Sequence, residues 1–132
     1  MLRSEARAAA MKLVYEWEMG GDGGEETWLD LLEVAPDEEE ADFAHRVADG
    51  TIQNCGAIDE TIAKYAKGWT VARMHKVDLC VLRVAIYEML YEKTPPEVVL
   101  NEAVLLAKEY CGDKAYSFVN GILGSFARAE LA

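Results

Sequence analysis

Few residues of this chain have the types and spacings that could carry out catalysis or bind a metal ion. His45 lies near Asp42 and Asp49, so the three share a helix face and could bind a metal, although such a stripe is more often an exposed charged face. His75 has no second candidate ligand at helical spacing. The glycine-rich run at residues 20–24 lacks Gly-Lys-Ser/Thr, and its acids repel phosphate. We therefore predict neither an active site nor a metal centre.

The cysteines and the apolar runs indicate where the protein acts. Cys55, Cys80 and Cys111 lie far apart and form no CxxC pair, which excludes an obvious disulfide framework or a cysteine-rich zinc site. No apolar run approaches the roughly 20 residues that a bilayer span needs, and no signal peptide is visible. We expect a cytoplasmic protein with reduced thiols and no contact with a membrane.

The charge distribution keeps nucleic-acid binding open. The net charge of -11 argues against phosphate contacts, which need Lys and Arg. Most of the acidity is local, however, because residues 1–42 hold 3 basic and 13 acidic residues. Residues 64–83 hold five basic residues and one acid, Asp78. A locally basic surface can therefore exist on this acidic protein.

Hydrophobic residues recur at helical spacing along almost the whole chain, and no run alternates with a period of two. We therefore expect an all-α fold, a compact bundle of about seven helices. The expected helices start near Ser4, Thr27, Pro36, Ile58, Met74, Thr94 and Asp113, and stop near Gly20, Glu33, Gly56, Gly68, Tyr91 and Gly112. The 132 residues fit one domain, which we divide into an N-terminal helical lobe (about 1–56) and a C-terminal lobe (about 57–132).

Some of the helix starts carry capping signals. Ser4, Thr94 and Asp113 are candidate N-caps, and Pro95, directly after Thr94, suits the first helical position because proline has no N–H group that needs an acceptor. These residues predict where three of the helices begin.

The segment 74–91 is apolar on nearly every side, which predicts a buried central helix. Arg83 lies within it, and we expect a buried ion pair or a hydrogen bond between the lobes, with Glu88 or Glu102 as the partner. Asn101 and Asn120 lie within other helical segments, where asparagine is a poor helix former. Hydrogen bonds that link helices would explain both. These patterns alone predict a helical binding module.

Three segments of the sequence resemble a known protein family, which the composition alone does not reveal. They are residues 6–17 (ARAAAMKLVYEW), residues 81–88 (VLRVAIYE) with Trp69 and Arg73 before them, and residues 96–108 (PEVVLNEAVLLAK) followed by FVNGIL at 118–123. In this order and at these spacings they resemble the NusB family of bacterial transcription antitermination factors. The resemblance covers about residues 4–126.

The resemblance implies an all-helical, non-enzymatic protein of two helical subdomains that uses no cofactor and no metal. Proteins of this family bind the single-stranded boxA element of leader and ribosomal RNA transcripts. They do so as a heterodimer with NusE, the ribosomal small-subunit protein, within the RNA polymerase elongation complex with other Nus factors. Single-stranded RNA is recognised through unstacked bases that stack on aromatic side chains. Homodimers are a further possibility that the resemblance leaves open.

The resemblance also implies roles for individual residues. The expected RNA-binding residues are Arg3, Arg7, Tyr15, Phe118 and Asn120, and the expected NusE-binding residues are Asp78 and Glu102. Arg3 and Arg7 lie four residues apart, so they share a helix face and could contact consecutive phosphates. Tyr15 and Phe118 could stack on bases, and packing in the core is the equal alternative for both.

The chain departs from the family pattern at its RNA-binding positions. Ser4 and Glu5 interrupt the usual N-terminal arginine cluster, and Ser117 stands where a lysine commonly precedes the FVNG phenylalanine. We therefore expect weak RNA binding by the chain alone, with NusE supplying most of the positive charge. The alternative is a protein-interaction module of the same fold that has lost strong RNA binding. A domain of an RNA cytosine methyltransferase would need a Rossmann-type catalytic domain, which we do not find in these 132 residues.

Overall fold

The structure is a computed structural model that describes residues 3–21, 38–112 and 114–131. These residues form six α-helices and one short 3-10 helix, η1, and contain no strand, which confirms the predicted all-α fold. The elements are α1 (Arg3–Glu18), α3 (Glu38–Gln53), α4 (Cys55–Tyr65), η1 (Val71–Arg73), α5 (Lys76–Tyr91), α6 (Pro96–Tyr110) and α7 (Ala115–Glu130). The helix expected at 27–33 and the helix start at Pro36 lie outside the described residues.

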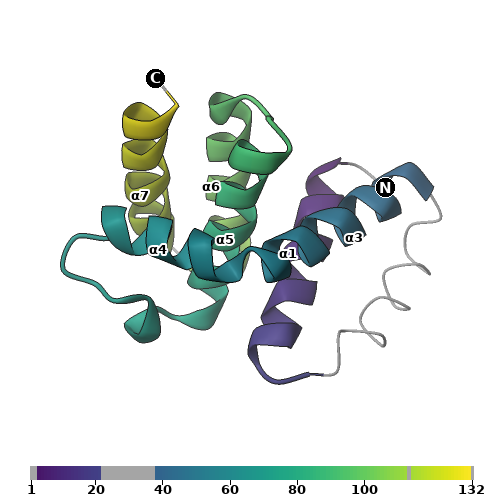
Figure 1. The fold of residues 1–132 in the computed structure, drawn as a ribbon, viewed down its shortest axis with the longest axis horizontal. Helices are drawn as coiled ribbons and strands as arrows, with labels where there is room; N and C mark the ends of the chain where they lie inside the picture. Colours follow the sequence, from purple (N-terminus) through teal and green to yellow (C-terminus); the bar gives the residue numbers. More distant parts are fainter. Residues whose placement is uncertain (1–2, 22–37, 113, 132) are drawn as a thin grey trace.

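Helix α5 is the centre of the fold. It contacts α1, α3, α4, α6 and α7, and every residue from Asp78 to Met89 is buried. Figure 1 shows α1 and α3 side by side at one end of the molecule and α6 and α7 side by side at the other. This arrangement confirms the prediction that the segment apolar on nearly every side is the buried central helix.

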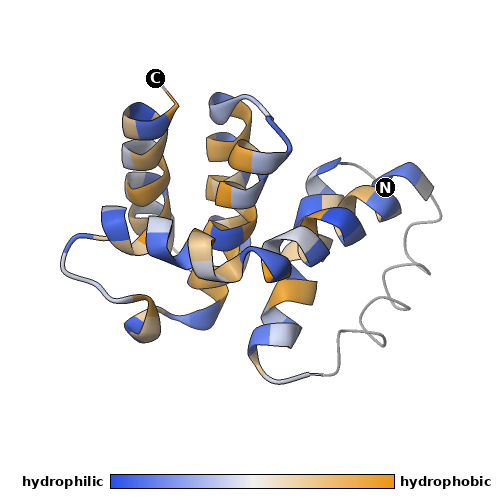
Figure 2. Ribbon diagram, in the orientation of Figure 1, coloured by the Kyte–Doolittle hydropathy of each residue, from blue (hydrophilic) through white to orange (hydrophobic). Residues whose placement is uncertain are grey.

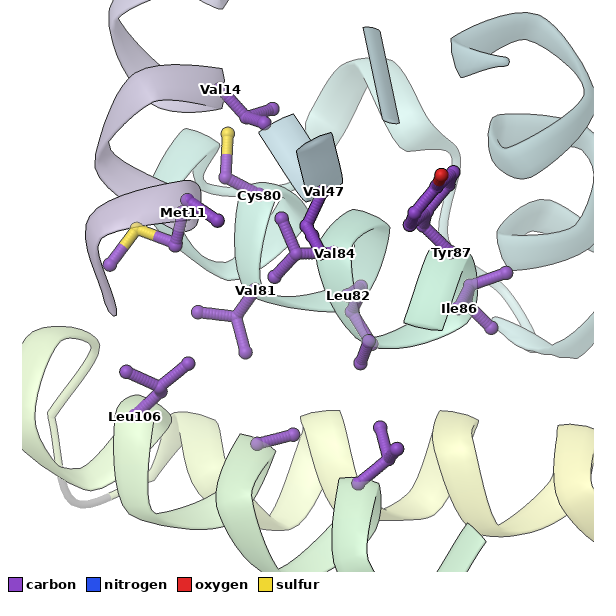
Figure 3. Packing of buried hydrophobic residues seen from close by; sticks show 14 of the residues in the cluster. Met11, Val14, Val47, Cys80, Val81, Leu82, Val84, Ile86, Tyr87 and Leu106 are labelled. Atoms are coloured by element: carbon purple, nitrogen blue, oxygen red, sulfur yellow. The ribbon is translucent and has the colours of Figure 1, made fainter. Parts of the chain in front are cut away.

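One hydrophobic core runs through the bundle. Its members come from every described α-helix. Figure 3 shows side chains of α1, α3 and α6 around those of α5: Met11, Val14, Val47 and Leu106 surround Cys80, Val81 and Val84. In Figure 2 the hydrophobic residues of α6 and α7 gather on the sides that face each other. The lobe boundary near residue 56 stays a prediction. In the described residues, no helix is long and apolar enough to cross a membrane.

The predicted helix stops at Gly20, Gly68 and Gly112 are confirmed, because all three have positive φ values of 86°, 80° and 94°. Gly50 is required for a different reason. A Cβ at this position of α3 would lie 2.3 Å from the ring of Tyr87 in α5, so only glycine permits this approach of the two helices.

Gly56 does not end a helix, contrary to the prediction. The break lies at Asn54, and α4 begins at Cys55 and contains Gly56. Gly56 has no positive φ, so its backbone conformation does not interrupt the helix. The side chain of Asn54 donates a hydrogen bond to the carbonyl oxygen of Gly50 at 2.8 Å, which marks the end of α3.

The predicted capping residues are also corrected. Ser4 lies inside α1, which begins at Arg3. Thr94 does not cap α6, because its hydroxyl donates to Glu88 Oε1 at 3.0 Å, and Pro95 takes the N-cap position before Pro96. The buried Glu88 carboxylate thus competes successfully for the hydroxyl. Lys114 is the N-cap of α7, and Asp113 lies outside the described residues.

Candidate RNA and partner interface

Arg7 is held in a buried ion pair that joins α1 to the centre of the fold. Its Nη2 lies 2.6 Å from Glu88 Oε1 and its Nε lies 2.9 Å from Glu88 Oε2. A second carboxylate, Glu102 of α6, lies 3.9 Å from Nη1. The side chains of Arg7 and Glu88 are only 10% and 4% exposed. Burial lowers the pKa of Arg7, but the hydrogen bond and charge of Glu88 outweigh it and raise that pKa.

Arg3 faces a different carboxylate. Its side chain is 42% exposed, its Nε lies 2.6 Å from Glu40 Oε2 of α3, and its guanidinium lies 4.0 Å from the ring centroid of Phe43. The guanidinium of Arg7 also approaches this ring, at 5.8 Å, so the two arginines share a helix face as predicted. Both are occupied by carboxylates in this structure, and Arg7 is not presented to solvent for a phosphate contact.

Arg83 forms the predicted buried ion pair, but the predicted partner is wrong. Its Nε and Nη2 each lie 2.8 Å from the carboxylate of Asp59 in α4, and its Nη1 lies 3.5 Å from Glu18 Oε2 in α1. Glu88 lies five residues further along α5, a rotation of roughly 140° about the helix axis, so it faces Arg7 instead. Burial lowers the pKa of Arg83, but the hydrogen bond and charge of Asp59 outweigh it and raise that pKa.

The face formed by α1, α6 and the start of α7 is hollowed by two neighbouring cavities. The first, which we call the α1–α6 groove, has a volume of about 560 Å³ and is lined by residues that include Ser4, Glu5, Lys12, Glu102 and Tyr110. The second, which we call the Trp69 pocket, also has a volume of about 560 Å³, and its lining includes Trp69, Asp78, Tyr110, Lys114 and Phe118. Tyr110 lines both cavities, so they adjoin one another.

Aromatic and cationic side chains gather along this face. Lys12 of α1 lies 5.0 Å from the ring centroid of Tyr110, and Lys114 lines the Trp69 pocket. Phe118 packs edge-to-face against Trp69, with the ring centroids 5.7 Å apart and the planes at 68°. Cations beside aromatic faces are the combination that binds single-stranded nucleic acid. The sequence pattern does not single out Lys12, Tyr110 or Lys114, because Lys12 lies about 100 positions before the other two and only packing places α1 beside them.

The expected RNA-binding aromatics and asparagine lie in three settings. Phe118 is half-buried, packs on the core and lines the Trp69 pocket, which confirms the core packing and leaves base stacking a prediction. Tyr15 is half-buried against the core. Asn120 is exposed and lines a third hollow, of about 390 Å³, together with Asn101 of α6. Neither asparagine side chain makes a hydrogen bond to another described residue, so the predicted link between helices is not found.

The expected NusE-binding residues lie in the same two cavities. Glu102 lines the α1–α6 groove, and Asp78 lines the Trp69 pocket from the first turn of α5. Asp78 is 9% exposed and lies beside Cys111. Burial and the hydrogen bond with Asp78 raise the pKa of the Cys111 thiol to about 12. Phe118 therefore shares a pocket with Asp78, and Arg7 lies beside Glu102, so two of the expected RNA-binding residues neighbour the expected NusE-binding residues.

His45 and Asp49 form an exposed pair, with Nε2 and Oδ2 3.2 Å apart. Among the residues that the structure describes, no group of three or more His, Cys, Asp or Glu side chains could hold a metal ion. The interpretation of residues 42–49 as a charged helix face agrees with this geometry.

The helical bundle and its cation- and aromatic-lined cavities define a binding protein. Comparisons with known proteins specify which kind. Residues 4–128 match the NusB family. The chain is 43% identical to the transcription antitermination protein NusB of Acetivibrio thermocellus, covering 99% of this chain and 92% of the relative. It is 39% identical to the protein of the same name from Finegoldia magna, covering 98% of this chain and 96% of the relative.

Solved structures agree. T. maritima NusB superposes with a TM-score of 0.82 at 34% identity, over 98% of this chain and 92% of that one. A crystal structure of the antitermination factors NusB and NusE in complex with dsRNA gives a TM-score of 0.84 at 27% identity, over 98% and 99% of the two chains. The chain belongs to the NusB family of transcription antitermination proteins, which are not enzymes. This confirms the resemblance on which the interpretation of the motifs rests.

Proposed function

We propose that this protein binds boxA-type single-stranded RNA together with NusE, as part of a cytoplasmic RNA polymerase elongation complex with other Nus factors. The observation that carries the proposal is the pair of cavities that adjoin at Tyr110. They bring Lys12 of α1 close to Lys114 and Phe118 at the start of α7, two parts of the chain about 100 positions apart. The solved complex of a similar NusB with NusE and dsRNA supports the coarser part, that a protein of this fold binds NusE and RNA.

In this proposal the cavities form one RNA path. Lys12 and Lys114 contact phosphates, while Tyr110 and Phe118 stack on bases, because aromatic faces accept any base. Tyr15 and Asn120 contribute from the flanks of the path. Arg3 is accessible and can exchange Glu40 for a phosphate, since an exposed ion pair contributes little to stability.

Arg7 has a different role in this proposal. Its guanidinium is occupied by Glu88, so it acts by holding α1 against α5 and α6 rather than by touching RNA. The α1–α6 groove depends on that contact, because its two walls are these helices. Arg7 is therefore proposed as a positioning residue for the RNA path.

NusE is proposed to contact Asp78 and Glu102. Both are carboxylates, and both line the cavities that we assign to RNA. Carboxylates accept hydrogen bonds from Lys and Arg of a basic partner, and they repel phosphate. NusE docked there would place its cations next to the RNA path, so that RNA binds a composite surface.

A titration of labelled boxA RNA tests this proposal. The RNA is titrated with this protein alone, with its cognate NusE alone and with both, and a scrambled RNA of equal length is the control. We expect weak binding by the protein alone and much tighter binding with NusE. The salt dependence should steepen by about 0.7 in log-log slope for each added phosphate contact. Equal affinity with and without NusE contradicts the proposal.

The second candidate function is an interaction module that binds NusE but no RNA. The placement of Ser4 and Glu5 favours it, because these two residues line the α1–α6 groove. They stand there instead of the arginines of the family pattern. A complex with NusE that binds boxA and scrambled RNA equally poorly would support this alternative.

A further inference from the structure

Trp69 is exposed although it borders a cavity. Its side chain is 52% exposed, and exposure of so large an apolar ring next to a pocket is typical of a binding surface. The ring lies against Phe118 of α7, with the centroids 5.7 Å apart. Phe118 already belongs to the proposed RNA path, whereas Trp69 has no role in it so far.

The backbone around Trp69 is held in place. Gly68, with a positive φ of 80°, turns the chain out of α4, and the N–H of Trp69 donates to the carbonyl oxygen of Ala66 at 2.9 Å. The 3-10 turn η1 follows, closed by the N–H of Arg73 donating to the oxygen of Thr70 at 3.0 Å. The indole is therefore presented at a fixed position on the rim of the pocket.

The charges near the pocket suit an anionic ligand. Lys114 lines the pocket, and Lys67 and Arg73 lie two and four residues from Trp69 in the chain. All three are exposed, and none forms an ion pair with another described residue. Asp78, in contrast, is nine-tenths buried within the pocket lining. An occupant that combines an aromatic ring with a negative charge on its backbone is a nucleotide.

We propose that Trp69 and Phe118 together form a clamp for one unstacked base of the RNA, with Lys114 on the adjoining phosphate. The cavity of about 560 Å³ lies within the range of ligand pockets, roughly 300–1,000 Å³. The exposed face of the indole offers a stacking surface, and the edge-to-face contact with Phe118 fixes its angle. This inference rests on the proposed function, because it requires that RNA follow the face through Tyr110.

Three variants test the clamp, each titrated with boxA RNA in the complex with NusE. Trp69→Ala removes the stacking surface and should weaken RNA binding about tenfold, the effect of losing one base–aromatic stack. Trp69→Phe keeps an aromatic ring and should retain most of the affinity. Tyr91→Ala is the matched control, because Tyr91 is also an exposed aromatic (46%) but stacks on Tyr87, outside both cavities. It should bind RNA as the unaltered protein does.

A scan of abasic RNAs identifies the base itself. Each RNA lacks one base, and we expect one position at which removal of the base weakens binding to the unaltered protein about tenfold. The same abasic RNA should bind Trp69→Ala no more weakly than intact RNA does, because the base and the indole act as one pair. Circular dichroism and NusE binding without RNA check that Trp69→Ala is folded and pairs normally.

The outcomes separate the clamp from the proposed function. If the unaltered complex binds no boxA RNA, both proposals fail. If it binds RNA but Trp69→Ala binds equally well, or every abasic effect persists in that variant, the clamp is overturned and the proposed function stands. If Trp69→Ala loses NusE binding in the absence of RNA, the pocket takes a side chain of the protein partner, and the clamp is likewise overturned.

Discussion

The ion pair between Arg7 and Glu88 yields the sharpest prediction about stability. Replacing Arg7 with Ala leaves the Glu88 carboxylate buried, with only the Thr94 hydroxyl as a hydrogen-bond partner in the described structure. Breaking a buried ion pair by removing one partner costs about 3–5 kcal/mol. The total stability of a domain is about 5–15 kcal/mol, so this loss is a large fraction of it. We expect the melting temperature to fall by roughly 10–20 °C.

The assay is thermal and urea unfolding of Arg7→Ala beside Arg3→Ala. Arg3 is the matched control, because it lies on the same helix and pairs with Glu40 across an exposed surface. An exposed pair contributes at most about 1 kcal/mol, so Arg3→Ala should melt near the unaltered protein. Replacing both members of the buried pair, as Arg7→Met with Glu88→Leu, should recover most of the loss, because no uncompensated charge remains.

The reasoning is refuted if Arg7→Ala and Arg3→Ala lose equal, small amounts of stability. It is also refuted if the double replacement is no more stable than Arg7→Ala alone. Either result would mean that the guanidinium of Arg7 is not buried against Glu88.

Three further predictions concern other parts of the molecule. Gly50→Ala should destabilise the protein by about 1–3 kcal/mol, because the new methyl group would meet the Tyr87 ring at 2.3 Å. Urea unfolding measures the loss, and an unchanged midpoint would show that α3 and α5 pack less closely. Glu5→Arg should raise the RNA affinity of the NusE complex severalfold, because Glu5 lines the α1–α6 groove, whereas Glu97→Arg, outside both cavities, should not. A similar gain from both would indicate a general charge effect. At about pH 8, Cys111 should react with iodoacetamide at least roughly 100-fold more slowly than a free thiol, because its pKa of about 12 leaves little thiolate. Mass spectrometry of labelled peptides measures the rate, with the urea-unfolded chain as the reference. Equal rates in the folded and unfolded chains would contradict this prediction.

Local patterns were sufficient for the elements themselves. The apolar character of residues 74–91 on all sides predicted the buried α5, because a helix without a polar face has no side to turn to water. The glycines at 20, 68 and 112 predicted helix ends because only glycine readily adopts a positive φ. Capping was predicted less well. Thr94 has the right side chain for a cap, but a buried carboxylate six residues earlier takes its hydroxyl.

Local patterns in the chain predict the helices, the central place of α5 and, through the NEAV and FVNG motifs, the family. The pairing of charges and the contacts between rings depend on how the helices pack. Arg7 pairs with Glu88 and Arg83 with Asp59, and Trp69 meets Phe118, across separations of 81, 24 and 49 positions in the chain. The spacing of residues along a helix specifies the face of that helix on which each residue lies. The packing of side chains between helices decides which other helix covers that face and how the two helices are aligned along their axes. The spacing of residues within one helix carries no information about this packing.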